Sequence, residues 1–227
     1  MDKQTLPTRA LLACGAVAGP LYVTVTMIEA LTRDGFDLKL HRFSWLTTGD
    51  LGWIHQSNMI LVGVLSVLLA VGVRQVMRTG RGAVWAPRLL GLFGVAYIIG
   101  GLLRADPVAG FPPGTTPEMV QTTWQGAVQN ASRAASTLLL IATSLVIAGR
   151  FAAEGRRALA WFCGVSIPMM FAALAAVGFA IGPGAVAFLA TPWIWVTALA
   201  VHMYRRAAKR RTDVLAGQGA TSASAAA

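Results

Sequence analysis

Six apolar stretches, each long enough to cross a lipid bilayer as a helix, dominate this chain of 227 residues. A bilayer core of about 30 Å needs roughly 20 residues of helix, because each residue advances a helix by about 1.5 Å. Hydrophobic side chains make up 56% of the chain and charged ones only 12%, a composition too apolar for a soluble domain of this size. The sequence therefore predicts an all-α integral membrane protein, a six-helix transmembrane bundle with spans at about 10–31, 53–77, 87–104, 123–149, 158–181 and 185–204.

Positive charges gather on one side of the predicted bundle. Lysines and arginines precede the first span, follow the last one, and fill the second-to-third and fourth-to-fifth connections, which six spans place on a single side of the membrane. Because cytoplasmic loops carry an excess of Lys and Arg, we expect both termini in the cytoplasm. The chain is then a multi-pass protein of the bacterial cytoplasmic (inner) membrane with an N-in/C-in topology.

The composition also indicates the domain boundaries and the kinds of partner. We expect one transmembrane domain over residues 1–211 and a disordered C-terminal tail over 212–227, where the side chains are small and polar. The topology explains the net charge of +10, so we expect membrane lipids and a lipophilic small-molecule ligand or substrate as partners, and no nucleic acid. Cys14 and Cys163 have no metal-ligand spacing and no nucleotide motif is visible, so we expect no metal and no cofactor. The sequence does not indicate the oligomeric state.

Two loops on the extracytoplasmic side hold more than solvent-exposed polar groups. The loop from Thr32 to Gly52 has seven large apolar side chains among its charges, which predicts a lid over the helix bundle, with a short helix or turn near residues 47–50. The loop from Asp106 to Thr122 contains four prolines and is expected to be an ordered, non-helical cover. We therefore expect two ordered extracytoplasmic loops to close the bundle on that side.

A polar stripe at helical spacing follows the fourth predicted span. It consists of Gln125, Gln129, Ser132, Arg133 and Ser136. Arg133 lies about 15 Å below the outer end of the span, where a guanidinium needs a counter-ion or a watered cavity. Four carboxylates are available on the same side: Glu29, Asp37, Asp50 and Asp106. The alternative is a buried ion pair that only fixes the helix register.

The second predicted span opens with polar and aromatic residues together. His55 and Asn58 are three residues apart, so they share one helix face and can point at one partner. His55 is either a hydrogen-bonded interfacial histidine or a group for proton transfer or ligand binding. Three tryptophans near this side, Trp45, Trp53 and Trp124, are ordinary interfacial anchors when each is taken alone.

Several motifs, most of them on the extracytoplasmic side, make the chain resemble a known family. They are Gly35-Phe36-Asp37, Gly49-Asp50-Leu51-Gly52-Trp53, Pro87-Arg88-Leu89-Leu90-Gly91 and Ala105-Asp106-Pro107 followed by Gly110-Phe111-Pro112-Pro113-Gly114-Thr115. Through these motifs the chain resembles the bacterial membrane family called domain of unknown function number 998, over nearly all six spans. The resemblance implies a compact six-helix bundle in the cytoplasmic membrane, and it implies no established activity.

One segment departs from the family pattern. Where the family has a His-Gly-x-x-His pair at the start of the fourth helix, this chain has Gln125-Gly126-Ala127-Val128-Gln129. Glutamine keeps the hydrogen-bonding capacity of the two histidines, but it does not titrate and binds transition metals poorly. A proton or metal role through that pair is therefore not expected in this chain.

Two hypotheses for the function follow from these residues. The first is a metal-independent membrane enzyme that acts on an isoprenoid or terpenoid-like substrate by general acid catalysis, such as a protonation-initiated cyclisation or isomerisation. Its candidate catalytic residues are Asp37, Asp50, Asp106, Glu29 and His55, and its candidate substrate-binding residues are Trp45, Trp53, Asn58, Arg104, Phe111, Trp124, Gln125, Gln129 and Arg133. The second is a non-enzymatic module, either a small transporter subunit, a lipid-binding accessory protein or a sensor, in which Arg104 and Arg133 clamp an anionic or lipidic ligand. The sequence does not choose between them.

Overall fold

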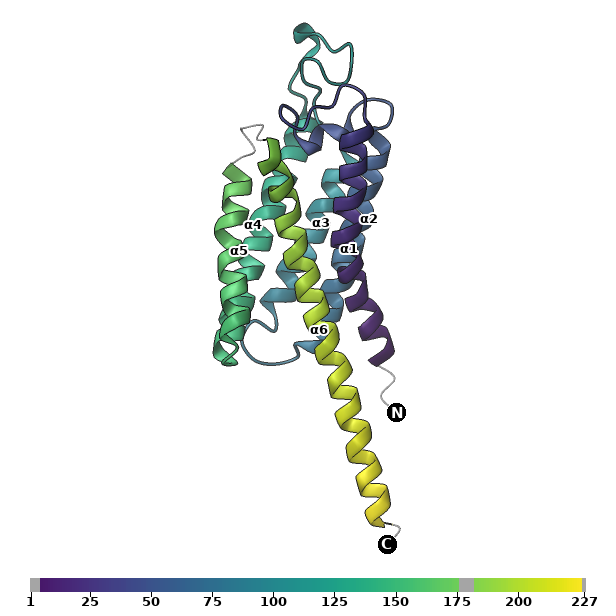
Figure 1. The fold of residues 1–227 in the computed structure, drawn as a ribbon, viewed down its shortest axis with the longest axis vertical. Coiled ribbons are helices and arrows are strands. Elements are labelled where there is room, and N and C mark those ends of the chain that lie inside the picture. Colours follow the sequence, from purple (N-terminus) through teal and green to yellow (C-terminus); the bar gives the residue numbers. More distant parts are fainter. Residues whose placement is uncertain (1–4, 176–181, 226–227) are drawn as a thin grey trace.

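The computed structural model describes residues 5–175 and 182–225 of the chain (Figure 1). Over these residues the chain forms six α-helices: α1 Thr5–Thr32, α2 Gly52–Val76, α3 Trp85–Leu102, α4 Trp124–Ala153, α5 Arg157–Ala175 and α6 Gly182–Ala225. Two short 3-10 helices, η1 (Phe43–Thr47) and η2 (Pro117–Met119), lie in the connections after α1 and after α3. The described residues contain no β-strand and only one isolated bridge, between Val108 and Phe111.

Five helices, α1, α2, α3, α4 and α6, are long and apolar enough to cross a membrane. Helix α5 is apolar as well, but its part Arg157–Ala172 is shorter than the others. The prediction of an all-α membrane protein is thus confirmed for the described residues. The predicted fifth span, 158–181, ends in residues 176–181, which lie outside them.

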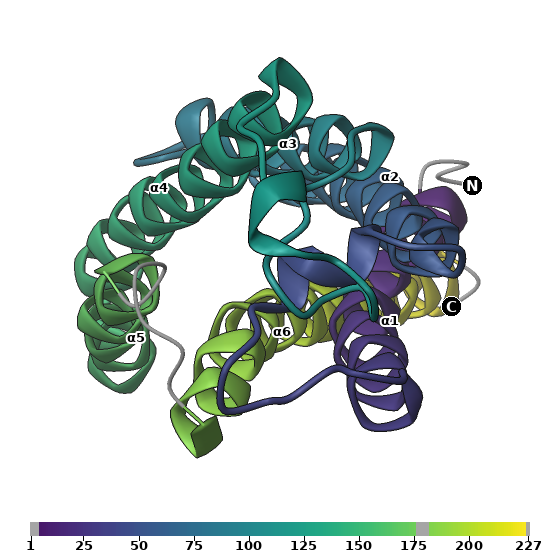
Figure 2. The ribbon, with the colours of Figure 1, turned by 90° about the horizontal axis from the view of Figure 1, so that it is seen from above.

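The helices form a ring in chain order when the molecule is seen from above (Figure 2). Each helix packs along the next one in the chain, and α6 completes the ring against α1. Small residues set the closest approaches, since a Cβ atom on Gly63 of α2 would lie 2.7 Å from the carbonyl oxygen of Gly94 on α3. A Cβ atom on Gly19 of α1 would collide with the Thr197 side chain of α6. Close backbone approach of this kind is how helices pack in lipid, where van der Waals contact replaces the hydrophobic driving force.

Most of the ring interior is filled by apolar and aromatic side chains. The fully buried ones come from all six helices and include Leu12, Leu69, Leu90, Leu140, Met170, Trp193 and Trp195. Because these side chains have no charged groups, the few ionisable residues that share the interior with them stand out. Those residues gather at one end of the ring.

The two ends of the ring differ in structure. Residues 33–51 and 103–123 cover one end, here called the lid end, whereas α1 begins and α6 finishes at the other, the terminal end (Figure 1). In the first of these connections η1 packs against α1 and α2, and its residues Phe43 and Leu46 are buried together with Ala30. The connection therefore lies on the bundle, as its apolar side chains predicted.

Arginines tie the helix ends together at the terminal end. Glu154, which follows α4, forms ion pairs with Arg150 at 2.8 Å, with Arg206 of α6 at 3.1 Å and with Arg156 at 3.6 Å. Arg150 also donates to the carbonyl oxygen of Arg81 in the connection between α2 and α3, at 3.0 Å. The arginine-rich connections thus lie at the same end of the bundle as the start of α1.

Helix α6 continues beyond the bundle through residues 212–225 (Figure 1). This segment is rich in alanine, which has the highest intrinsic helix propensity.

Candidate binding site at the lid end

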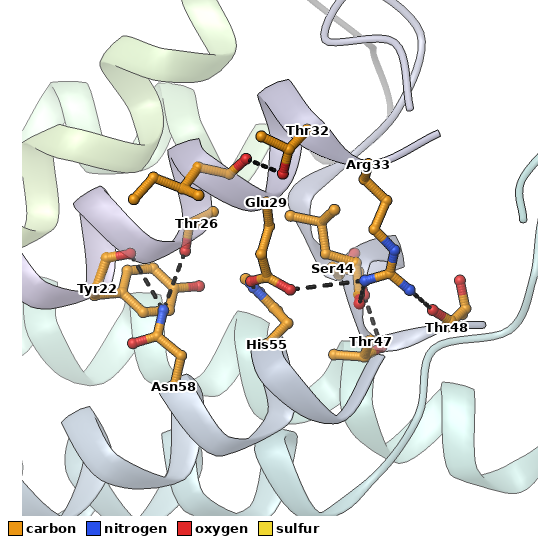
Figure 3. A network of polar contacts seen from close by, with 12 residues as sticks. Tyr22, Thr26, Glu29, Thr32, Arg33, Ser44, Thr47, Thr48, His55 and Asn58 are labelled. Atoms are coloured by element: carbon orange, nitrogen blue, oxygen red, sulfur yellow. Dashed lines mark hydrogen bonds and ion pairs between the residues drawn. The ribbon is translucent and has the colours of Figure 1, made fainter. Parts of the chain in front are cut away.

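The most polar part of the bundle interior surrounds Glu29. This residue lies in the last turn of α1, and His55 lies in the first turn of α2, so the antiparallel helices bring the two side chains together. His55 Nδ1 is 2.9 Å from Glu29 Oε2, and Arg33 Nη1 is 3.6 Å from Glu29 Oε1 (Figure 3). All three side chains are buried, with exposed fractions of 1% for His55, 6% for Glu29 and 8% for Arg33. Glu29 therefore connects α2 with the first residue after α1.

Arg33 holds the lid onto this pair of helices. Its Nη1 donates to the carbonyl oxygen of Leu46 at 2.9 Å, and its Nη2 donates to the carbonyl oxygen of Thr48. Burial lowers the pKa of the Arg33 guanidinium, while the charges of Glu29 and Asp50 act to raise it. Because the ordinary pKa of arginine is above 12, the side chain keeps its charge at neutral pH. The lid is thus fastened by charge-assisted hydrogen bonds.

Thr47 is the second point at which the lid meets the helices. Its hydroxyl donates to the carbonyl oxygen of Ser44 at 2.8 Å, and it accepts from the N–H of Ala105 at 2.9 Å and from Gln129 Nε2 at 3.3 Å. Thr47 and Gln129 are both fully buried. One hydroxyl therefore joins η1 to α4 and to the connection that follows α3.

Arg133 lies one turn deeper than Gln129 on the same face of α4. Its Nη1 is buried and has no hydrogen-bond partner. We predicted either a counter-ion or a watered cavity around Arg133. Among the described residues no carboxylate forms an ion pair with Arg133, because Glu29 pairs with Arg33. Burial and the charge of Arg133 both lower the pKa of Arg42, a lid residue. The guanidinium of Arg133 therefore lies within electrostatic range of the lid.

Aromatic side chains from three helices adjoin these polar groups. The ring centroid of Tyr22 on α1 lies 5.5 Å from that of Tyr97 on α3, 4.9 Å from that of Trp193 on α6 and 5.9 Å from that of His55. The charge of Arg133 acts on both tyrosines. Helices α1, α2, α3, α4 and α6 thus each contribute a side chain to one interior region.

Several buried polar atoms in this region have no hydrogen-bond partner. They are Glu29 Oε1, His55 Nε2, Asn58 Oδ1, Gln129 Oε1, Arg133 Nη1 and Trp193 Nε1. Buried polar atoms are nearly always paired in folded proteins, because an unpaired one keeps its full desolvation cost. A cluster of such atoms at one end of a bundle is therefore a candidate binding site. Within the described residues, no three His, Cys, Asp or Glu side chains are grouped so as to hold a metal ion.

Asp106, a predicted catalytic acid, supports the start of α4. Its Oδ1 accepts from the Thr123 hydroxyl at 2.6 Å, and Thr123 in turn accepts from the N–H of Gly126 at 3.1 Å as the N-cap of the helix. A side chain at Gly126 would collide with the Asp106 carboxylate. The structure thus places this acid in a helix cap and not in the interior region.

The predicted acids Asp37 and Asp50 also lie outside the interior region. Asp37 Oδ1 accepts from the N–H of Lys39 at 2.7 Å, and the N–H of Asp37 donates to His41 Nδ1 at 2.9 Å, so this residue organises a turn of the lid. Asp50 is exposed in the turn that precedes α2. Of the four predicted acids, only Glu29 is buried among the helices.

The remaining predicted residues fall into three groups. Around Tyr22 the structure brings together His55, Asn58 and the charge of Arg133, while Gln129 lies one turn from Arg133 on α4 and donates to Thr47. In the lid lie Trp45, whose ring is 5.3 Å from the guanidinium of Arg42, and Phe111, which is fully buried. On the outside of the protein are Trp53, Trp124, Gln125 and Arg104, with Trp53 59% and Trp124 69% exposed.

Sequence reasoning missed four residues of this region: Tyr22, Tyr97, Thr47 and Arg33. A signal for the tyrosines was present, because the chain has only three and two of them lie within apolar spans, where a hydroxyl needs a polar neighbour. Nothing in the sequence distinguishes Thr47 or Arg33 from the other polar residues of the lid. Their roles depend on which carbonyl and amide groups the folded lid places beside them.

Comparison with known proteins places most of the chain in one family. The family described as protein of unknown function, DUF998, matches residues 16–202. The match covers the lid end and runs from α1 into α6. Neither a curated protein nor a solved structure matches the chain.

Proposed function

The chain belongs to the DUF998 family, whose description names no activity, and we propose from the geometry of the lid end that the protein binds an anionic amphiphile there. The single observation that carries the proposal is Arg133, a guanidinium within the bundle whose buried Nη1 has no partner. The protein is then the non-enzymatic membrane module of the two hypotheses, with Arg133 as the anion-binding group and without Arg104, which is exposed. Its membrane-embedded helices and apolar interior suit a ligand with a lipid-like tail.

Arg133 is half-buried, and the buried Nη1 edge of its guanidinium is shielded from water without a partner. Burying a charge costs several kcal/mol even after the surroundings relax, and a partner charge or hydrogen bonds must offset that cost. Arg33 has such partners in Glu29 and two lid carbonyls, whereas Arg133 has no ion pair among the described residues. An anionic headgroup of a ligand supplies the missing acceptor, and a planar guanidinium suits carboxylate or phosphate oxygens in particular.

The lid determines how such a ligand enters. The bonds from Thr47 to Gln129 and to Ala105 hold η1 over the turn of α4 that precedes Arg133, and both are neutral hydrogen bonds. Neutral hydrogen bonds contribute about 1 kcal/mol each, so separating Thr47 from Gln129 and Ala105 needs less energy than separating Arg33 from Glu29. We propose that the Thr47 side of η1 opens while Arg33 keeps its bonds to Leu46 and Thr48.

The general acid hypothesis has less support from the site. It needs a carboxylic acid that stays protonated in apolar surroundings. Asp37 and Asp106 organise loop turns and a helix cap, Asp50 is exposed, and Glu29 faces two basic side chains. That environment of Glu29 is typical of an ion pair. Cyclisation or isomerisation of a terpenoid-like substrate by one of these acids is therefore the less supported of the two hypotheses.

The proposed topology keeps six spans with both termini in the cytoplasm of a bacterium and a single domain over residues 1–211. Support comes from the arginine-rich connections at the terminal end, because positive charge marks the cytoplasmic side. The lid end is then extracytoplasmic, so that amphiphiles of the outer leaflet have access to it.

Binding of two lysolipids with the same 12-carbon chain tests the proposal. Lysophosphatidylmethanol is anionic and lysophosphatidylcholine is zwitterionic, and native mass spectrometry of the detergent-purified protein measures how much of each is retained. We expect the wild-type protein to prefer the anionic lipid by about tenfold, the effect of one charge-assisted hydrogen bond. Arg133→Gln should remove that preference.

Arg104→Gln is the matched control, because it removes one positive charge from an exposed residue at the same end of the molecule. This variant should retain the preference for the anionic lipid. If Arg133→Gln and Arg104→Gln behave alike, Arg133 is not the binding group and the proposal fails. Circular dichroism and gel filtration of each variant check that the fold is unchanged.

A further inference from the structure

The unpartnered atoms around Arg133 are mostly hydrogen-bond acceptors, and this follows from their neighbours. Asn58 Nδ2 lies 3.3 Å from the carbonyl oxygen of Tyr22 and 3.4 Å from Thr26 Oγ1 (Figure 3). A backbone carbonyl only accepts hydrogen bonds, so the amide of Asn58 must present its NH₂ group to Tyr22. The orientation of the amide is thereby settled, and Asn58 Oδ1 is left as a buried acceptor without a donor.

The orientation of the Gln129 amide is likewise settled by its neighbour. The single hydrogen of the Thr47 hydroxyl is used in the bond to the carbonyl oxygen of Ser44 at 2.8 Å. Thr47 Oγ1 can therefore only accept from Gln129, and the side chain of Gln129 must present its NH₂ group to it. Gln129 Oε1 is the second buried acceptor without a donor.

His55 provides a third acceptor. Its Nδ1 faces the Glu29 carboxylate at 2.9 Å, and a carboxylate accepts hydrogen bonds, so Nδ1 carries the proton. His55 Nε2 is buried without a partner, and it accepts a hydrogen bond in the neutral form of the ring. Asn58 Oδ1, Gln129 Oε1 and, in that form, His55 Nε2 are therefore acceptors, and the unpartnered donors beside them are Arg133 Nη1 and Trp193 Nε1.

The three acceptors belong to one region of the interior. His55 and Asn58 are three residues apart on one face of α2, and Gln129 and Arg133 are four apart on one face of α4. Tyr22 connects the two faces, because its ring adjoins His55, its carbonyl group binds Asn58 and the charge of Arg133 acts on it. One headgroup can therefore meet groups from both helices once η1 moves aside.

We propose that the ligand of this site is an anionic amphiphile whose headgroup carries hydroxyl groups, such as a phosphoglycerol. This inference rests on the proposed function and adds the chemistry of the headgroup to it. The phosphate oxygens accept from Arg133, and the hydroxyl groups donate to Asn58 Oδ1, Gln129 Oε1 and His55 Nε2. Without these donors each buried acceptor keeps its desolvation cost. A site built to receive hydroxyl groups discriminates strongly against an analogue that lacks them.

The charges nearby exclude the other common donor, an ammonium group. Arg133 is positive and has no ion pair among the described residues, whereas Glu29 is already paired with Arg33 and His55. A cationic headgroup placed beside Arg133 would be repelled by it. Hydroxyl groups donate without adding charge, so they are the donors that this region accepts.

The test compares two lipids of equal charge on the full-length protein. Lysophosphatidylglycerol and lysophosphatidylmethanol with the same 12-carbon chain both have one negative charge, and they differ in the hydroxyl groups of the headgroup. We expect the wild-type protein to bind lysophosphatidylglycerol about tenfold more tightly in native mass spectrometry titrations, the effect of two neutral hydrogen bonds. Equal affinity of the wild-type protein for the two lipids overturns this inference, and that result needs no variant.

Variants locate the effect within the site. Asn58→Leu and Gln129→Met keep the side-chain size and remove the acceptors, so each should reduce the preference for lysophosphatidylglycerol and leave the affinity for lysophosphatidylmethanol unchanged. The controls are Asn130→Leu and Gln125→Met, because both residues are exposed on α4. An undiminished preference in Asn58→Leu and Gln129→Met, with both variants folded, also contradicts the inference.

Different binding results would overturn this inference and the proposed function. If both anionic lipids bind equally and Arg133→Gln weakens both, the anion site stands and the headgroup inference is wrong. If neither lipid binds better than lysophosphatidylcholine, the proposed function is wrong.

Discussion

Glu29 shows how one buried carboxylate can serve two elements. One of its oxygens pairs with His55 on α2 and the other with Arg33 at the start of the lid. The geometry keeps the carboxylate between basic groups, so its role is to orient His55 and to hold Arg33. A buried ion pair of this kind is most sensitive to the loss of one partner, because the remaining charge is left uncompensated.

Removing the carboxylate should therefore destabilise the protein. We expect Glu29→Leu to lower the free energy of unfolding by about 3 kcal/mol, since Arg33 then lies buried without a counter-charge. Thermal unfolding in detergent measures the change, with Glu118→Leu as a control at an exposed carboxylate of η2. The double variant Glu29→Leu with Arg33→Leu should recover part of the loss. An equal loss in the single and double variants would show that the ion pair is not the cause.

At the scale of elements, the lid is attached to the helices by bonds of unequal strength. Arg33 holds it near α1 with charged bonds, whereas Thr47 holds η1 to α4 and to the α3 connection with neutral ones. A segment attached in this way opens at its weaker side first. Opening at Thr47 uncovers Gln129 and the turn of α4 that precedes Arg133.

The Thr47 hydroxyl can be removed with little change of shape. Thr47→Val leaves the N–H of Ala105 and the Gln129 amide without their partner, and an unsatisfied buried donor costs about 1–3 kcal/mol. We expect hydrogen exchange of residues 43–52 to accelerate by about tenfold or more. Thr48→Val is the control, because the Thr48 hydroxyl donates only to Trp45 within η1. The same acceleration in both variants would mean that Thr47 does not latch the lid.

At the scale of the whole molecule, the ring of helices has two chemically distinct ends. The lid end holds Glu29 and its basic partners, while the terminal end holds arginines around Glu154. Burial acts to raise the pKa of the Glu154 carboxyl, but the charges and hydrogen bonds of Arg206 and Arg150 outweigh burial and lower it below the ordinary value. Glu154 thus joins α4 to α6 through its ionised form.

The lowered pKa of Glu154 makes part of the stability depend on pH. A carboxyl group whose pKa is lower in the folded state stabilises the fold above its unfolded pKa, about 4.3, and this contribution is lost as the pH falls through the folded pKa. We expect Glu154→Gln to unfold at a lower temperature than the wild-type protein at pH 7, with the difference closing as the pH falls below about 4. Thermal unfolding from pH 7 to pH 3 measures this. Asp34→Asn, at an exposed residue, is the control, and a gap for Glu154→Gln that stays constant with pH contradicts the prediction.

The sequence by itself determined the all-α membrane class, the approximate positions of the helices and the lid over residues 32–52. These follow from local properties, because the length of an apolar run decides whether it can cross a bilayer. It also indicated the polar stripe of α4, since Gln129 and Arg133 must share a face at helical spacing. Each of these features needs only neighbours along the chain.

Only the tertiary structure decided which charges meet. Arg33 pairs with Glu29 in place of Arg133, Asp106 caps α4, and Trp53 and Trp124 are exposed. Pairing between separate helices depends on how the ring of helices closes and on the rotation of each helix about its axis. Spacing within one helix does not contain that information. That Arg133 Nη1 has no hydrogen-bond partner can be recognised only when all of its neighbours have been placed.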